Sequence, residues 1–236
     1  MSILGIVTSH ATLRKDQGQM HGRIFSPFRV GHFIILPEGD PVPPEGGIPL
    51  IMGKKGAFGS GEHETTASCL EELERLPGIA GMRCLDLGSG TGILAIAAAR
   101  LGAGKVVAID IAAAAAASCA ANVRLNGMED HVLPVCGELG CLRERDFDLI
   151  MANIYADIHL ALAGEMVART RPGGFLLLSG IPVQDNFDIQ LRFRREGCEL
   201  MDSRFMEEYV TFLFRKDDKF VKSPSAVLRE SLVTEA

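Results

Sequence analysis

The fold of this chain is decided by residues 82–110, MRCLDLGSGTGILAIAAARLGAGKVVAID. An apolar run over 84–87 that contains one acid predicts a buried strand, and this strand leads into a turn with three glycines. Residues 93–100 have a helical pattern without proline, and residues 105–110 form a second apolar strand that ends on an acid. A strand, a helix and a strand in this order predict a right-handed crossover between parallel, neighbouring strands.

The glycine-rich turn has the properties of a ligand-binding loop. Glycine permits positive φ angles and lets a ligand approach the main chain closely. The helix after the turn begins with unpaired N–H groups, which can bind a polar or anionic group. Asp110 ends the next strand, where a carboxylate can accept hydrogen bonds from both hydroxyls of a ribose. We therefore expect a nucleoside-containing ligand at this edge of the sheet.

The spacing of the glycines indicates which class of ligand the turn binds. The dinucleotide pattern G-x-G-x-x-G needs glycine at position 93, which is Ile93 here. The turn reads D-x-G-x-G-x-G over 86–92 and resembles motif I of the S-adenosylmethionine-dependent methyltransferases. The alternative is a generic Rossmann turn for NAD or another nucleotide. The resemblance implies S-adenosyl-L-methionine as cofactor and, as its contacts, Asp86, Gly88, Ser89, Gly90 and Asp110.

Other segments narrow the resemblance to one family. AFGSGEHETTASCL (57–70), ANIYA (152–156) and RPGGFLLLSGI (171–181) resemble segments of the PrmA-type ribosomal protein L-eleven methyltransferases. That family carries N-I-x-A and then K-P-G-G-x-L-x-L-S-G-I, and the match extends over roughly residues 25–216. The resemblance implies that Phe58 and Thr66 help to bind the cofactor. A core aromatic and a helix cap are the alternatives for these two residues.

Asn153 is the candidate catalytic residue. It follows a strand predicted over 147–152, at the carboxyl edge where open α/β sheets bind ligands. Its amide oxygen can accept a hydrogen bond from an amine, and the family resemblance implies contact with both cofactor and acceptor. An ordinary turn asparagine is the alternative. Ile154 and Tyr155 stand where N-P-P-Y sites have two prolines, which disfavours a flipped adenine as the acceptor.

Two further polar residues are candidates for this site. His63 is a candidate for a polar residue of the lid over the pocket. Glu138 follows the third predicted strand, where it could meet the amino group of an adenine.

The remaining sequence alternates as a doubly wound α/β fold requires. Strands are predicted over 131–136, 147–152 and 175–179, helices over 65–76, 157–170 and 183–195, and a hairpin over 198–201 and 209–215. A terminal hairpin with an inserted antiparallel strand is typical of methyltransferases and is absent from NAD-binding sheets. We therefore predict a seven-stranded, Rossmann-like methyltransferase sheet with a C-terminal antiparallel hairpin.

Three regions are expected along the chain. Residues 1–56 form an N-terminal extension or linker-like segment, in which one strand over 29–36 pairs with another over 48–52. Residues 57–216 form the methyltransferase domain, and residues 217–236 form a polar tail. Residues 25–56 resemble the family's interdomain segment, and at most some 25 residues precede them. We therefore expect no room for the family's N-terminal recognition domain, which leaves the acceptor open.

Composition disfavours several classes of protein. The chain has 236 residues, 47% of them hydrophobic, and a formal net charge of −6, which describes a globular protein and not a basic DNA-binding protein. Its six cysteines form no C-x-x-C pair, so we expect free thiols in a reducing cytoplasm and no metal site. We expect neither a signal peptide nor a membrane-spanning helix, because no N-terminal run and no 18-residue span is apolar enough. It does not predict an oligomeric state.

These observations favour a cytoplasmic protein methyltransferase. The expected acceptor is an amino group, on a lysine side chain or an N-terminus, of a protein such as a ribosomal protein. A small-molecule or RNA methyltransferase is the first alternative. The second is a cofactor-binding protein without turnover, because a run of six alanines (112–117) replaces the mixed-charge helix and second acid that the family usually has after Asp110.

Overall fold

The computed structural model describes residues 25–43, 46–53 and 63–219, which form a large and a small sheet. The large sheet has seven strands: β4 (Arg83–Leu87), β5 (Lys105–Asp110), β6 (Val132–Cys136), β7 (Phe147–Asn153), β8 (Thr170–Pro182), β9 (Cys198–Phe205) and β10 (Tyr209–Lys216). Their order is β6-β5-β4-β7-β8-β10-β9. Strand β10 runs antiparallel to both of its neighbours, and all other pairs are parallel. The predicted doubly wound sheet with a terminal hairpin is confirmed.

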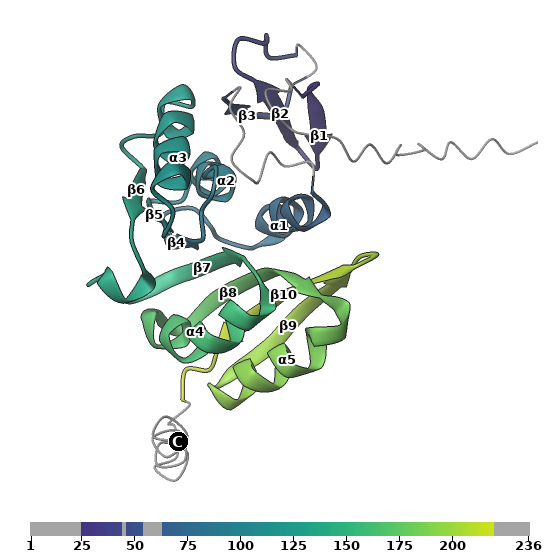
Figure 1. The fold of residues 1–236 in the computed structure, drawn as a ribbon, viewed down its shortest axis with the longest axis vertical. Coiled ribbons are helices and arrows are strands. Elements are labelled where there is room, and N and C mark those ends of the chain that lie inside the picture. Colours follow the sequence, from purple (N-terminus) through teal and green to yellow (C-terminus); the bar gives the residue numbers. More distant parts are fainter. Residues whose placement is uncertain (1–24, 44–45, 54–62, 220–236) are drawn as a thin grey trace, which may run out of the picture.

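The helices cover both faces of this sheet (Figure 1). The described helices are α1 (Glu64–Arg75), α2 (Ile93–Arg100), α3 (Ala113–Leu125), α4 (Ala156–Arg169) and α5 (Asn186–Arg195), with 3-10 turns η1 (Leu139–Cys141) and η2 (Val183–Asp185). Helices α1, α2 and α3 lie on one face, and α4 and α5 lie on the other. Each face has its own apolar core. Burying both faces explains why the central strands are almost continuously apolar.

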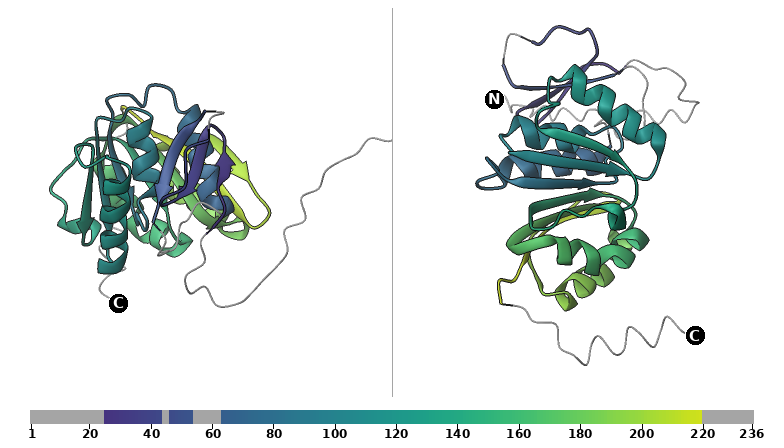
Figure 2. Two further views of the ribbon diagram at one scale, coloured as in Figure 1. Left: turned by 90° about the horizontal axis from the view of Figure 1, so that it is seen from above. Right: turned by 90° about the vertical axis from the view of Figure 1, so that its left-hand side faces the viewer.

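The small sheet packs on the helices of the first face (Figure 2). It consists of β1 (Phe28–Val30), β2 (Phe33–Pro37) and β3 (Ile48–Met52). Its apolar side chains join the core that contains Leu70 and Leu73 of α1. The side-chain amide of Asn126 fixes β3, because it accepts from Ile51 N at 3.0 Å and donates to Ile51 O at 2.7 Å.

Three details of the predicted secondary structure were wrong. The single strand expected over 29–36 is an antiparallel pair, β1 and β2, because Gly31 adopts φ = +55° and turns the chain. Its expected partner over 48–52 is confirmed as β3, which pairs in parallel with β2. Strand β8 begins at Thr170, the residue at which the helix predicted over 157–170 was expected to end. Asn153 is the last residue of β7 and does not follow that strand.

None of the described helices is both long and apolar enough to cross a membrane. Within the same part of the chain, no three His, Cys, Asp or Glu side chains are grouped to hold a metal ion.

Candidate active site

The predicted site residues within the described ranges gather at the carboxyl edge of the parallel strands. The glycine turn follows β4, Asp110 ends β5 and Asn153 ends β7, and these strands are parallel neighbours. Thr66 joins them from the first turn of α1. The candidate Phe58 lies outside the described residues, and nothing follows for it from the structure.

The carboxylate of Asp110 holds the glycine turn against β5. Its Oδ2 accepts a hydrogen bond from Gly90 N, and its Oδ1 accepts one from Ala112 N, both at 2.9 Å. Gly88 N and Ser89 N both donate to Ile109 O, which fixes the turn a second time. Asp110 is only partly buried, and each of its oxygens has a further lone pair. The side chain can therefore accept hydrogen bonds from a ribose diol while it also supports the turn.

Asp86 lies beneath the turn. Only 2% of this residue is exposed, and its Oδ2 accepts a hydrogen bond from Ala95 N of α2 at 3.1 Å. Burial raises the pKa of Asp86 to about 7, the Ala95 N–H opposes this rise, and the nearby charge of Asp110 adds to it. Asp86 thus connects β4 to the start of α2 from a buried position. Its predicted contact with the cofactor stays a prediction.

Gly88 lets the end of β7 pack against the turn. It adopts φ = +72°, and a Cβ added there would lie 2.4 Å from Ile154 Cγ2. A side chain at this position would be strained by the backbone and would also collide with Ile154. The close contact between the turn after β4 and the segment after β7 therefore requires glycine.

Asn153 and Thr66 are in contact although they are far apart in the sequence. Asn153 Nδ2 donates a hydrogen bond to Thr66 Oγ1 at 3.3 Å. Thr66 is 3% exposed, and the N-cap of α1 is His63, whose Nδ1 accepts from Thr65 N. The alternative in which Thr66 caps the helix is therefore wrong. The exposed ring of His63 packs edge-on against Tyr209, with 5.2 Å between the centroids.

The residues that support Asn153 from behind were not identified from the sequence. Ser179 O accepts from Ile154 N at 3.2 Å and from His159 Nε2 at 2.9 Å. Since a carbonyl can only accept, Nε2 carries a proton. His159 is fully buried, and burial lowers its pKa to about 4, so the imidazole is neutral. The S-G-I motif over 179–181 is part of the family resemblance, but it gives no indication that His159 bonds to Ser179.

Gly180 completes this support. It adopts φ = +77°, and an added Cβ would lie 2.5 Å from Ile154 O and 3.1 Å from Asn153 Oδ1. Next to it, the hydroxyls of Ser179 and Thr211 share a hydrogen bond of 2.7 Å. The carboxyl ends of β7 and β8 are thereby held together, and Asn153 is held with them.

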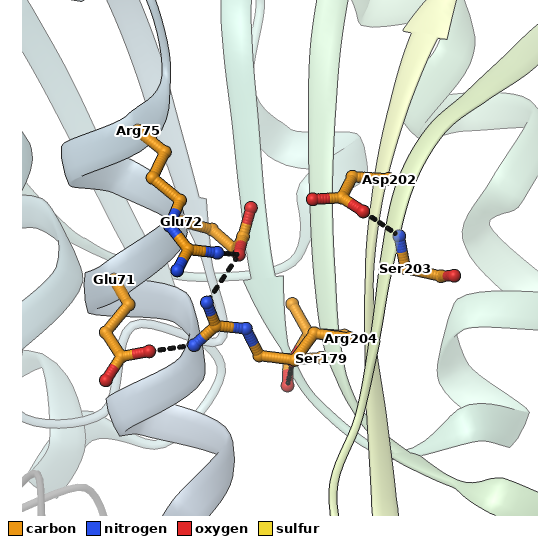
Figure 3. Close-up of polar contacts among 8 residues, drawn as sticks. Glu71, Glu72, Arg75, Ser179, Asp202, Ser203 and Arg204 are labelled. Carbon is orange, nitrogen blue, oxygen red and sulfur yellow. Dashed lines mark hydrogen bonds and ion pairs between the residues drawn. The ribbon is translucent and has the colours of Figure 1, made fainter.

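Helix α1, which carries Thr66, is fixed to the far edge of the sheet by a cluster of charges (Figure 3). Arg204 of β9 forms ion pairs with Glu71 and Glu72, and Glu72 also pairs with Arg75 at 3.1 Å. Glu72 is 5% exposed. Burial raises its pKa and the charge of Asp202 adds to this rise, whereas Arg75 opposes it. The position of α1 therefore depends on a buried carboxylate and the cations around it.

The carboxyl edge is acidic. Its segments that the structure describes (63–66, 88–92, 110–112, 136–140, 153–159, 180–188 and 205–209) contain no Lys or Arg. They contain Glu64, Asp110, Glu138, Asp157, Asp185, Asp188, Glu207 and Glu208. The side chains of the helices contribute to this acidity. Helices α1, α4 and α5 each have an acid in the first turn, at this edge, and Arg in the last turn, away from it. Glu138 is exposed and lies one strand beyond Asp110, since Gly137 N donates to Asp110 O.

Three comparisons with known proteins agree with this geometry. A family model described as ribosomal protein L11 methyltransferase (PrmA) matches residues 8–217. A curated relative, the ribosomal protein L11 methyltransferase of Pelobacter propionicus, is 39% identical over 198 residues, which are 81% of this chain. The alignment covers 64% of that relative, so the chain spans slightly less than two thirds of its length.

Two solved methyltransferase structures are also similar to this chain. The ribosomal protein L11 methylase of Lactobacillus delbrueckii subsp. bulgaricus is similar with a TM-score of 0.75 and 28% identity, over 81% of this chain and 100% of that chain. The T. thermophilus 16S rRNA methyltransferase RsmC, solved with AdoMet and guanosine, is similar with a TM-score of 0.57 and 26% identity. That match covers 69% of this chain and 46% of the RsmC chain.

Proposed function

The chain belongs to the ribosomal protein L11 methyltransferase (PrmA) family, and on this premise we propose that it is an S-adenosylmethionine-dependent protein methyltransferase. The proposed acceptor is an amino group, on a lysine side chain or an N-terminus, and ribosomal protein L11 is the first acceptor to test. The observation that carries the proposal is the meeting of the glycine turn, Asp110 and Asn153 at one edge of the sheet.

The residues at this edge suit the cofactor. When bound, S-adenosylmethionine supplies a methyl group on a positively charged sulfur, which is left as a neutral thioether after transfer. In our proposal, the main chain of Gly88, Ser89 and Gly90 holds the methionine end and Asp110 accepts from the ribose. A cationic ligand also fits an edge whose described segments lack Lys and Arg. Asp86 acts from below by holding the turn on α2.

Asn153 is the proposed catalytic residue. Its amide oxygen would accept a hydrogen bond from the acceptor amine and fix the direction of the nitrogen lone pair. The ordinary pKa of lysine is about 10.4. The site therefore has to favour the reactive neutral amine by excluding water and by accepting hydrogen bonds from its N–H groups. Thr66, Gly180 and Ser179 hold Asn153 in place for this task. Accurate positioning of reactants contributes up to about 7–11 kcal/mol to catalysis in general.

The charge of the site favours a protein acceptor over RNA. RNA methylation is the second candidate function, because RsmC shares this fold. An RNA would bring phosphates to an edge at which the described segments have eight acids and neither Lys nor Arg. A lysine-bearing protein would instead meet complementary charge. We further propose that residues 57–216 form the catalytic domain, preceded by an extension (1–56) and followed by a tail. A ribosomal protein as acceptor would place the reaction in the cytoplasm.

The experiment that tests the proposal is a methyl-transfer assay with labelled cofactor. The purified chain is incubated with ribosomal protein L11, with total ribosomal RNA and with a small-molecule fraction of a cell extract, each separately. We expect label on the protein, and Asn153→Ala should lower the rate of labelling about 100-fold. Label that enters only the RNA or the small molecules would overturn the proposed acceptor. Cofactor binding without transfer to any fraction would indicate a binding protein without turnover.

A further inference from the structure

Among the described residues, the three most exposed large apolar side chains all lie at the carboxyl edge of the sheet. They are Ile111 (76% exposed), Tyr155 (73%) and Phe187 (69%). Ile111 directly follows Asp110 and therefore lies on the side of the edge that we assign to the cofactor. Tyr155 and Phe187 follow β7 and β8 and lie on the side of Asn153.

Tyr155 and Phe187 lie at the starts of two helices that begin at the same edge of the sheet. Tyr155 is the N-cap of α4, two residues after Asn153, and Phe187 is the second residue of α5. The two helices pack side by side on one face of the sheet and both begin at its carboxyl edge (Figure 1). Ile158, which is 37% exposed, lies one turn into α4 from Tyr155. We call Tyr155, Ile158 and Phe187 the acceptor-side patch.

The packing of the two helices on the sheet does not depend on the patch residues. Helix α4 buries His159, Ala163, Met166 and Val167, and α5 buries Ile189 and Phe193. Tyr155 makes no side-chain cap for α4. Single exposed apolar residues are common, but here the most exposed ones are gathered at the edge where the reaction is proposed to occur.

Three carboxylates flank the patch. Asp157 and Asp188 lie in the first turns of α4 and α5, and Asp185 ends η2 just before α5. An aromatic ring beside carboxylates suits a lysine, because its methylene stem packs on the ring and its ammonium meets the charge. Aromatic side chains are also the commonest anchors of protein interfaces.

We propose that the acceptor-side patch is a docking surface for a basic, lysine-bearing segment of the protein acceptor. Tyr155 and Phe187 anchor the segment, and Asp157, Asp185 and Asp188 pair with cations on either side of the target lysine. This proposal rests on the proposed function and adds to it the surface that selects the acceptor. RNA bases could stack on the same rings, but the RNA phosphates would then face the three acids.

The test is a binding measurement that does not depend on turnover. Fluorescently labelled ribosomal protein L11 is titrated with the chain in the presence of S-adenosylhomocysteine, and its dissociation constant is compared between variants. Y155S/F187S should weaken binding about tenfold or more. Serine is a favourable N-cap, so the change at Tyr155 should not unfold α4. D157N/D185N/D188N should also weaken binding, and it should reduce the salt dependence.

The matched control is Leu133→Ser in β6, where an apolar side chain is 56% exposed away from this edge. The control and both sets of variants should bind the cofactor as the unmodified chain does. L11 binding that is unchanged in Y155S/F187S, or tighter binding of a ribosomal RNA hairpin than of L11, would overturn the docking surface. Failure of the unmodified chain to bind L11 would do the same. If L11 binds but is not methylated, the docking surface stands and the proposed activity fails.

Discussion

The side-chain amide of Asn153 donates a hydrogen bond to Thr66 across 87 residues of sequence, with 3.3 Å between Nδ2 and Oγ1. The bond connects the end of β7 to the first turn of α1. One role of Thr66 is therefore to hold Asn153, which is distinct from the cofactor contact that the family resemblance implies. The two roles can be separated by experiment, because holding Asn153 affects the rate of methyl transfer whereas a direct contact affects cofactor binding.

We expect Asn153→Ala to lower the rate of methyl transfer about 100-fold while cofactor binding changes less than about threefold. In-line geometry is a property of the transition state, whereas the cofactor is held mainly by the turn and Asp110. Asn153→Asp should bind the cofactor at least as well and still transfer poorly, because its charge stabilises the cationic ground state most. Calorimetry and single-turnover rates give the two quantities. Transfer at the original rate in both variants would leave Asn153 with only a structural role at the end of β7.

Thr66→Val should behave as a weaker version of Asn153→Ala, with Thr66→Ser as the control that keeps the hydroxyl. If Thr66 positions Asn153, the valine variant loses rate and keeps its cofactor affinity. A large loss of affinity in Thr66→Val would instead support direct contact between Thr66 and the cofactor.

Gly180→Ala should lower both stability and methyl transfer. The left-handed conformation costs a residue with a side chain roughly 1–2 kcal/mol, and the added Cβ would also collide with Ile154 O. Gly127→Ala is the matched control, because Gly127 has φ = +62° but nothing within 4 Å of an added Cβ. Thermal unfolding of the two variants isolates the collision as their difference. Equal destabilisation, with full activity in both, would contradict the role given to Gly180.

Asp110→Ala should weaken cofactor binding about tenfold to 100-fold, since each hydrogen bond to a charged group contributes about 1.5–3 kcal/mol. The structure adds a second cause, because the carboxylate also holds Gly90 N and Ala112 N. Adenosine and methionine, titrated separately as competing ligands, distinguish the two causes. Loss of adenosine binding alone indicates the ribose contact, and loss of both indicates a disordered turn. A dissociation constant unchanged within about twofold would exclude Asp110 from the site.

The pH dependence of stability should report on Asp86. Its pKa is about 7 in the folded chain, above the ordinary value of 3.8, so folding favours the protonated form. The stability linked to this group is therefore fully present below about pH 4 and is lost as the pH rises to about 7. Asp86→Asn removes that dependence and keeps an oxygen for Ala95 N. The measurement is the free energy of unfolding of both proteins between about pH 4 and pH 7. The same change with pH in both proteins would contradict the raised pKa of Asp86.

The sequence predicted the sheet well because its strongest signals are local. The apolar runs of β4, β5 and β7, and the glycines between β4 and α2, each follow from a few adjacent residues. The pair of strands β1 and β2 was missed because Phe28–Pro37 is apolar on both sides of a turn that depends on one glycine, Gly31. Local patterns do not show where such a run reverses.

The candidate site could be predicted only in part, for the same reason. Asp110 and Asn153 could be predicted as candidates because each ends an apolar strand beside a recognisable motif. His159, Gly180 and Arg204 act through contacts with residues distant in the sequence, such as Ser179 O, Ile154 O and Glu72. No spacing within the sequence indicates such contacts.

The side chain of Arg204 is 23% exposed and connects β9 to Glu71 and Glu72 of α1. Arg204→Ala leaves the buried carboxylate of Glu72 with Arg75 as its remaining ion-pair partner and Asp202 nearby. We expect a loss of up to about 3 kcal/mol in the free energy of unfolding, because an uncompensated buried charge is costly. Arg75→Ala removes a cation from the same carboxylate. Because the Arg75 side chain is 62% exposed, this substitution should lower the free energy of unfolding by less than about 1 kcal/mol.

The sign of the pH effect makes this prediction specific. The pKa of Glu72 is already raised by burial and should rise further without Arg204, so protonation at low pH relieves the unpaired charge. The loss in Arg204→Ala should therefore be smaller at pH 5 than at pH 8, and Glu72→Gln in the same chain should restore part of it. Methyl transfer should fall together with stability, because α1 carries Thr66. Chemical denaturation of the single and double variants at both pH values gives the answer. A loss that is the same at pH 5 and pH 8, with no rescue by Glu72→Gln, would mean that Arg204 acts through packing and not through its charge.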